Sequence, residues 1–140
     1  MDRPDAATAE SHRGEPDGRV DEVARAVIGA AIEVHRCLGP GYLERVYEGA
    51  LRVELRLRGI AFERQKAIPV VYKGQAIGQG RVDFLIEDDL ILELKAVDTL
   101  LPIHTAQMIS YLKALRRRLG LLINFNVPML RRGIQRIVRS

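Results

Sequence analysis

The sequence is poor in cysteine and has no long run of apolar residues. A single cysteine among 140 residues excludes an internal disulfide and any zinc site built from several cysteines. No apolar stretch has the length needed to span a membrane, and the first residues lack the hydrophobic core of a signal peptide. We therefore expect a cytoplasmic protein without a membrane segment, in which Cys37 is a small buried residue near a helix end.

Charge is unevenly distributed along the chain. The formal net charge is +4, but residues 1–18 hold more acids than bases, so the positive excess belongs to the rest of the chain. Much of it lies late, where the run Arg116, Arg117 and Arg118 is followed by four more arginines. A basic surface of this kind fits a polyanionic partner such as nucleic acid. The arginine run is therefore our candidate for phosphate contacts.

Length and composition indicate one domain after a short tail. Residues 1–18 are small, polar and without periodicity, which predicts a disordered tail, and residues 19–140 are expected to form the domain. Helical spacing of apolar residues predicts helices over 20–37 and 42–58. A third helix is expected to begin at Pro102, continue to Arg118 and stop at Gly120, with Met108, Leu112, Leu115 and Leu119 as its core stripe.

Strand patterns fill the middle and the end of the chain. One hairpin is expected to turn at Lys73-Gly74, with Gly78 and Gly80 permitting a bulge or a close approach. A second hairpin covers residues 82–97, a buried strand covers 121–127, and residues 133–138 form an edge strand or short final element. The order α-α-β-β-β-α-β-β predicts an α/β (α+β) domain with a mixed β-sheet flanked by helices.

Three charged residues lie inside the otherwise apolar second hairpin. A three-residue turn at Glu87-Asp88-Asp89 places Asp83 directly opposite Glu93, with Lys95 two residues further along the same face. The other face then carries only apolar residues, namely Val82, Phe84, Ile86, Leu90, Leu92 and Leu94. A two-residue turn would instead mix polar and apolar residues on both faces, so the pattern favours the three-residue turn.

Two interpretations of these charges remain open at this point. Carboxylates opposed across a sheet repel by roughly 0.2–1 kcal/mol, and Lys95 could offset this in a salt-bridged cluster on a solvated face. Alternatively, the opposed carboxylates bind a divalent cation through hard oxygen ligands. On the second helix, Glu44 lies at the margin of the apolar arc and should face the sheet. Glu54 also projects from that arc, but Arg58 at i+4 gives it an ion-pair partner.

Residues 41–47 read GYLERVY, a full GxxExxY motif, and the chain resembles the bacterial GxxExxY proteins, which are classed with the PD-(D/E)XK nuclease superfamily. The resemblance runs from the first helix to the end of the chain. It implies a restriction-endonuclease-like fold in which Asp83 is the metal-binding aspartate, although Val82 replaces the proline of the motif. Glu93-Leu94-Lys95 corresponds to the (D/E)XK, and Glu44 to the acid of an early helix. Gln107 and Tyr111 form a QxxxY resembling that of the RecB-like exonuclease branch.

The resemblance also implies a mechanism. Asp83, Glu93 and the main-chain carbonyl of Leu94 would hold Mg²⁺ or Mn²⁺, with Glu44 ligating it directly or through water. Lys95 would position the attacking water and stabilise the transition state, while Gln107 and Tyr111 would orient Lys95 or the phosphate. Such hydrolysis needs no serine or cysteine nucleophile, and none is suitably placed.

The function expected from this mechanism is cleavage of nucleic acid, with DNA favoured. Two alternatives are a catalytically silent nucleic-acid-binding module and a structural or partner-binding protein that retains the fold. The domain is small for a nuclease working alone, which is compatible with a homodimer or a helper protein.

Overall fold

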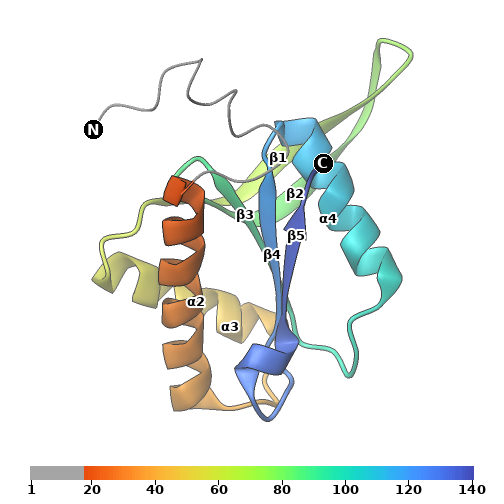
Figure 1. Cartoon of the computed structure of the whole chain (residues 1–140). Coiled ribbons are helices and arrows are strands. Elements are labelled where there is room, and N and C mark those ends of the chain that lie inside the picture. The colour runs from red at the N-terminus through yellow and green to blue at the C-terminus, as the bar shows by residue number, and fades with distance from the viewer. Residues whose placement is uncertain (1–17) are drawn as a thin grey trace.

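A five-stranded mixed sheet forms the centre of the molecule (Figure 1). Its strands lie in the order β1-β2-β3-β4-β5, and all neighbours are antiparallel except β3 and β4, which are parallel. The strand bounds are β1 (Phe62–Tyr72), β2 (Gln75–Ile86), β3 (Leu90–Lys95), β4 (Leu119–Asn124) and β5 (Ile134–Val138).

Helices cover both faces of this sheet (Figure 1). One face packs against α2 (Gly18–Leu38) and α3 (Glu44–Leu57), and the other against α4 (Pro102–Leu115). A short 3₁₀ helix, η1 (Leu130–Gly133), precedes β5. The predicted fold, an α/β domain with a mixed sheet flanked by helices in the order α-α-β-β-β-α-β-β, is therefore confirmed.

The computed structural model describes residues 18–140. The predicted disordered tail of residues 1–18 lies outside them, except for Gly18, which is the first residue of α2. Within the described residues, no helix combines the length and the apolar character needed to cross a membrane.

The third helix is shorter than predicted. It ends at Leu115 instead of Arg118, because Arg116 adopts a left-handed conformation with φ of 56° and caps the helix. Leu119, predicted to extend the core stripe of this helix, is instead the first residue of β4. Gly120 does not stop the helix. It lies in β4 under α4, where a Cβ atom would collide with the sulfur of Met108, so glycine permits the close approach of helix and strand.

Both hairpins turn where the sequence predicts. The first turns at Lys73 and Gly74, which both have positive φ, and its register shifts between Val70 and Val71. In the second hairpin Ile86 pairs with Leu90 and Phe84 with Leu92, which confirms the three-residue turn. Gly80 provides the expected close approach, because a Cβ atom there would lie 3.0 Å from the ring of Tyr111.

One residue lies on the other side of the sheet from the prediction. Val82 was expected beside Phe84, but it packs in the cluster under α4, whereas Phe84 packs under α2 and α3. The change occurs where the β1–β2 ladder omits the pair of Gln65 and Asp83, and Gln65 has a left-handed φ of 51°. Strict alternation of faces is therefore interrupted at Asp83.

Candidate metal centre

The side chains of Asp83 and Glu93 accept hydrogen bonds from main-chain amides at the point where the regular β2–β3 ladder ends. The last ladder pair is Phe84 with Leu92. Beyond it, the amide N–H of Asp83 donates to Oε1 of Glu93 at 2.8 Å, and the amide N–H of Leu94 donates to Oδ2 of Asp83 at 2.7 Å. Each carboxylate is thus tied to the main chain of the opposite strand. Both are held rigidly and keep lone pairs for a further ligand.

These two carboxylates are electrostatically strained. Glu93 is only 6% exposed, and burial together with the charge of Asp83 raises the pKa of Glu93 to about 8. Burial likewise raises the pKa of Asp83 above its ordinary value. Lys95 lowers both pKa values through its charge, yet within residues 18–140 it forms no ion pair with either acid. The arrangement therefore lacks both features of a solvated salt-bridged cluster.

Glu44 approaches the pair from the helical layer. It is the first residue of α3, and its pKa is raised by burial and then by the charge of Asp83, while Lys95 lowers it. These mutual effects place Glu44, Asp83, Glu93 and Lys95 in one electrostatic cluster. The structure thus brings together the four charged residues that the sequence assigned to the site.

The glycine and the tyrosine of the GxxExxY segment hold the loop that precedes Glu44. The hydroxyl of Tyr47 donates to the carbonyl of Gly39 at 2.6 Å and accepts from the amide of Tyr42 at 3.1 Å. Its ring is fully buried and stacks on Phe125 at a centroid distance of 4.6 Å. Gly41 has φ of 111°, a conformation that favours glycine. The motif therefore fixes the loop that delivers Glu44 at the start of α3.

Tyr111 reaches the site from α4, and Gln107 lies one helical turn before it. Burial, followed by the charges of Glu93 and Asp83, raises the pKa of the Tyr111 hydroxyl. Its ring rests against Gly80 of β2. Gln107 is exposed on the same helix. Tyr111 therefore shares the electrostatic environment of the acids, whereas the orienting role of Gln107 remains a prediction.

Two residues near the acids were not identified from the sequence. The side chain of Glu48 is only 14% exposed, and its charge raises the pKa values of Asp83 and Glu44. The Glu48 carboxylate accepts hydrogen bonds from the guanidinium of Arg64 at 2.9 Å and from the side-chain amide Nε2 of Gln65 at 3.1 Å. The i, i+4 spacing of Glu44 and Glu48 is the signal that could have found Glu48. No sequence pattern indicated the left-handed backbone conformation of Gln65.

Asn124 holds the chain that follows Lys95. This asparagine is 2% exposed and pairs with Lys95 across β3 and β4. Its Oδ1 accepts from the amide of Val97 at 3.0 Å, and its Nδ2 donates to the carbonyl of Val97 at 2.9 Å. The amide of Phe125 also donates to the carbonyl of Lys95 at 2.9 Å. The main chain around the lysine is therefore fixed on its C-terminal side.

The arginine run lies at the other end of the β2–β3 hairpin. Arg117 donates to the carbonyl of Asp88 at 2.8 Å and to its carboxylate at 3.0 Å, at the hairpin turn. Asp83 and Glu93 lie four residues into their strands from that turn, or roughly 13 Å away. The structure therefore does not bring Arg116, Arg117 and Arg118 together with the acids. Their role in nucleic-acid binding remains a prediction.

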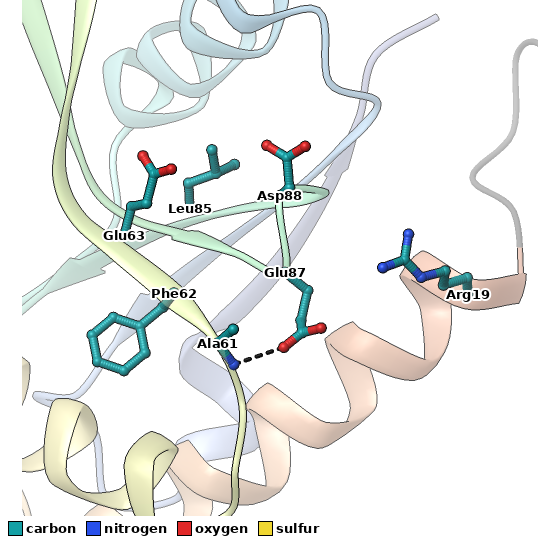
Figure 2. Close-up of a pocket in the computed structure, with 7 residues that line it drawn as sticks. All are labelled: Arg19, Ala61, Phe62, Glu63, Leu85, Glu87 and Asp88. Carbon is teal, nitrogen blue, oxygen red and sulfur yellow. Dashed lines mark hydrogen bonds between the residues drawn. The ribbon is translucent and has the colours of Figure 1, made fainter. Parts of the chain in front are cut away.

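A surface pocket at the same turn also lies away from the acids (Figure 2). It is lined by Arg19, Ala61, Phe62, Glu63, Leu85, Glu87 and Asp88. Glu87 is used locally, because its carboxylate accepts from the amide of Ala61 at 2.6 Å. The pocket is therefore a feature of the turn and shares no residue with the predicted site.

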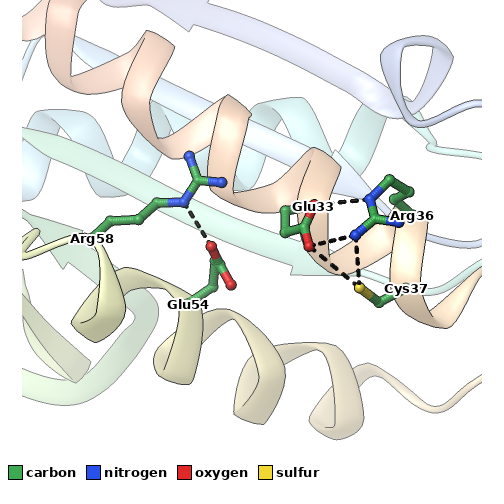
Figure 3. A network of polar contacts seen from close by, with 5 residues as sticks. All are labelled: Glu33, Arg36, Cys37, Glu54 and Arg58. Carbon is green, nitrogen blue, oxygen red and sulfur yellow. Dashed lines mark hydrogen bonds and ion pairs between the residues drawn. The ribbon is translucent and has the colours of Figure 1, made fainter.

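The outer surfaces of α2 and α3 carry a polar network that corrects one prediction and fulfils another (Figure 3). Cys37 is exposed, not buried as predicted, because it lies on the outer side of α2, where its thiol is 3.4 Å from the carboxylate of Glu33. That hydrogen bond raises the pKa of the Cys37 thiol. Glu54 pairs with Arg58 at 2.7 Å, as its spacing predicts.

The donor set at the acids fits a hard divalent cation. Among residues 18–140, no three His, Cys, Asp or Glu side chains are grouped closely enough to hold a metal ion by themselves. Mg²⁺ needs less from the protein, because it commonly binds through one or two carboxylates and keeps several waters. Asp83 and Glu93 provide such a pair, and their unfavourable burial would be relieved by a cation.

A mixed sheet with helices on both faces, and with opposed acids at the end of one hairpin, is a restriction-endonuclease-like arrangement. The family model described as PD-(D/E)XK nuclease superfamily matches residues 21–137. The chain therefore belongs to the PD-(D/E)XK nuclease superfamily. No curated protein matched the sequence.

Proposed function

We propose that this protein is a metal-dependent nuclease that hydrolyses phosphodiester bonds in nucleic acid, with DNA as the favoured substrate. Superfamily membership supports nuclease-like chemistry. The observation that carries the proposal is the opposed pair of Asp83, which is partly buried, and Glu93, which is buried, each hydrogen-bonded to the main chain of the other strand. A fold needs no such repulsion for its own stability, so the arrangement is best explained by a bound cation.

The residues of the site have distinct proposed roles. Asp83, Glu93 and the carbonyl of Leu94 would hold Mg²⁺ or Mn²⁺, with Glu44 as a ligand directly or through water. When bound, this cation would neutralise charge on the phosphate and lower the pKa of a water molecule. Lys95, without an ion-pair partner among the described residues, is available to position that water and to stabilise negative charge that develops on the phosphate.

Two residues on α4 would support this chemistry. Tyr111, whose pKa is raised by burial and by the charges of Glu93 and Asp83, would orient Lys95 or the phosphate from the side of α4. Gln107 would assist from the preceding turn. We also place the chain in the GxxExxY group, since its motif fixes the loop before Glu44, and regard the QxxxY motif as a RecB-like feature.

Cleavage assays on labelled single-stranded and double-stranded DNA and RNA test the proposal directly. We expect cleavage with Mg²⁺ or Mn²⁺ and none with EDTA. Lys95→Ala should reduce the cleavage rate by at least about 100-fold with a modest change in substrate binding, because the lysine acts mainly in the transition state.

A matched control is Lys113→Ala, which removes an exposed lysine of α4 and should leave the rate unchanged. Turnover by Lys95→Ala at the wild-type rate would refute the role of the lysine. Binding of nucleic acid by wild-type protein without any cleavage would support the catalytically silent alternative.

A further inference from the structure

The β1–β2 hairpin extends well beyond the rest of the sheet (Figure 1). Strand β2 pairs with β3 only from Phe84 to Ile86, whereas its pairing with β1 continues to the tip at Lys73 and Gly74. We call residues 67–81 the hairpin arm. Its base is anchored by Ile68, which is 2% exposed under α4, and by the contact of Gly80 with Tyr111. The arm therefore projects from the sheet, while its base is packed against α4.

The arm presents apolar side chains to solvent. All eleven residues from 69 to 79 are exposed. Four of them are large and apolar, with exposed fractions of 43% for Val70, 59% for Val71, 59% for Tyr72 and 62% for Ile77. Clustered apolar exposure of this kind usually marks a surface that binds a partner. Because β1 is also an edge strand, the arm needs a partner or a protective feature.

The charge of the arm indicates which partner fits. Residues 64–82 contain no aspartate or glutamate, while Lys66, Lys73 and Arg81 add positive charge along the hairpin. Lys66 pairs with Glu63, and Lys73 lies over the ring of Tyr72 at 5.4 Å. Within residues 18–140, neither Lys73 nor Arg81 forms an ion pair. An exposed aromatic ring beside unpaired cations suits a polyanion whose bases can stack.

The position of the arm relative to the acids strengthens this match. Arg81 precedes Asp83 by two residues on β2, so the basic arm leads directly into the proposed metal site. Tyr111, which interacts electrostatically with Asp83 and Glu93, also contacts Gly80 at the base of the arm. A nucleic acid lying across the acids would therefore meet the arm, whereas the arginine run lies at the opposite end of β2 and β3.

We propose that the hairpin arm binds the nucleic acid beside the site of cleavage, with Tyr72 stacking on a base and Lys73 and Arg81 contacting phosphates. This inference rests on the proposed nuclease function and identifies the surface that holds its substrate. It replaces the arginine run as the main binding surface. A second copy of the chain is the competing occupant, because apolar edge strands also pair with one another.

Binding measurements can separate these possibilities. Fluorescence anisotropy with short labelled single strands and duplexes is measured in the Lys95→Ala background, so that cleavage does not interfere. Tyr72→Ala should weaken single-strand binding by at least about fivefold, as expected for loss of one stacked base. Replacing Lys73 and Arg81 together with Gln should reduce the slope of log K against log salt by about 1–2, as expected for two phosphate contacts.

A matched control removes two positive charges elsewhere. Replacing Arg25 of α2 and Lys113 of α4 with Gln should leave the salt slope unchanged. All of these side chains are exposed, so the variants should fold, and thermal melts verify this. Wild-type binding and slope in the arm variants, or a change confined to the Arg25 and Lys113 variant, would overturn the proposal.

Two further measurements distinguish failure of the arm from failure of the nuclease proposal. Bis-p-nitrophenyl phosphate is a small substrate that does not extend to the arm. With Lys95 intact, the arm variants should therefore hydrolyse it at the wild-type rate. If this activity is present but the arm variants bind normally, the arm inference fails alone. If wild type binds nucleic acid through the arm but cleaves nothing, the nuclease proposal fails alone.

Sedimentation velocity tests the competing occupant. The arm proposal predicts that Tyr72→Ala leaves the oligomeric state unchanged. A wild-type dimer that dissociates on Tyr72→Ala, with nucleic-acid binding unaffected, would show that the arm joins two copies and would overturn the proposal. Absence of any nucleic-acid binding by wild type at low salt would overturn it equally.

Discussion

The acids at the two ends of the β2–β3 hairpin have different partners: the turn carries Glu87, Asp88 and Asp89, and the opposite end carries Asp83 and Glu93. At the turn, Asp88 pairs with Arg117 at 3.0 Å and Asp89 with Arg19 at 2.8 Å. At the other end, Asp83 and Glu93 are hydrogen-bonded to main-chain amides and have no cationic partner within residues 18–140. The charges of Asp88 and Asp89 are thus balanced by arginines, and Glu87 accepts from the main-chain amide of Ala61. The opposite end is complete only with a cation that the described chain does not supply, which is the physical basis for the proposed metal site.

The largest expected difference between the two ends is their response to metal. Mg²⁺ at a hundred times its dissociation constant should stabilise wild type by about 2.7 kcal/mol, a shift of order ten degrees in melting temperature. Asp83→Asn should lose most of this shift. Without metal it should be as stable as wild type or slightly more so, because the Asp83 charge that raises the pKa of Glu93 is removed while an oxygen remains to accept from Leu94.

Thermal melts with EDTA and with Mg²⁺ measure both effects. Asp88→Asn is the matched control at the turn and should keep the full response to Mg²⁺. A wild-type protein indifferent to Mg²⁺ and Mn²⁺, or equal responses in the two variants, would remove the distinction between the ends.

The next effect concerns pH in the absence of metal. The pKa of Glu93 is raised from 4.5 to about 8, so between these values the folded protein holds a proton that the unfolded chain has released. The free energy of unfolding should therefore fall as pH rises through this window, by up to about 1.4 kcal/mol per pH unit. Glu93→Gln should reduce this slope and be more stable than wild type near pH 8.

Urea unfolding in EDTA at several pH values between about 5 and 8 checks this dependence. Some slope should persist in Glu93→Gln, since burial also raises the pKa values of Asp83 and Glu44. Glu63→Gln, an exposed glutamate on β1, is the control and should follow wild type. Identical slopes in wild type and Glu93→Gln would contradict the burial of a charged group at this end.

A smaller effect is expected from the backbone opposite Asp83. Gln65 has φ of 51°, a conformation that costs about 1–2 kcal/mol in residues other than glycine. Gln65→Ala and Gln65→Gly both remove the amide that donates to Glu48, but only glycine relieves the backbone. The glycine variant should therefore be more stable than the alanine variant by roughly 1 kcal/mol in urea unfolding. Equal stabilities would show that the strain is absent.

The smallest effect is expected at the turn itself. Asp88→Asn removes a pair whose aspartate side chain is 59% exposed, so the loss of stability should not exceed about 1 kcal/mol and should shrink with added salt. Denaturant unfolding at low and high salt measures it. A loss of several kcal/mol would mean that the turn acids are as critical to the fold as the buried ones.

Local patterns predicted the elements of this fold well, because they depend on neighbours in sequence. Alternation of apolar residues was sufficient to fix the three-residue turn and so to place Asp83 opposite Glu93. The end of α4 was predicted wrongly because Gly120 was taken as the stop signal, whereas the helix ends at a left-handed Arg116. Gly120 instead serves packing against Met108, a contact between residues of different elements that no local pattern reports.

The sequence by itself determined the order of the elements, the register of the second hairpin and the identity of the opposed acids, because periodicity and turn chemistry act over a few residues. Only the tertiary structure decided which charges have partners. It paired Arg117 with Asp88, placed Glu48 and Gln65 near Asp83, exposed Cys37 and put the arginine run at the far end of the hairpin. These outcomes depend on how the helices pack on the sheet and how the sheet twists, and such long-range geometry has no signature in local spacing.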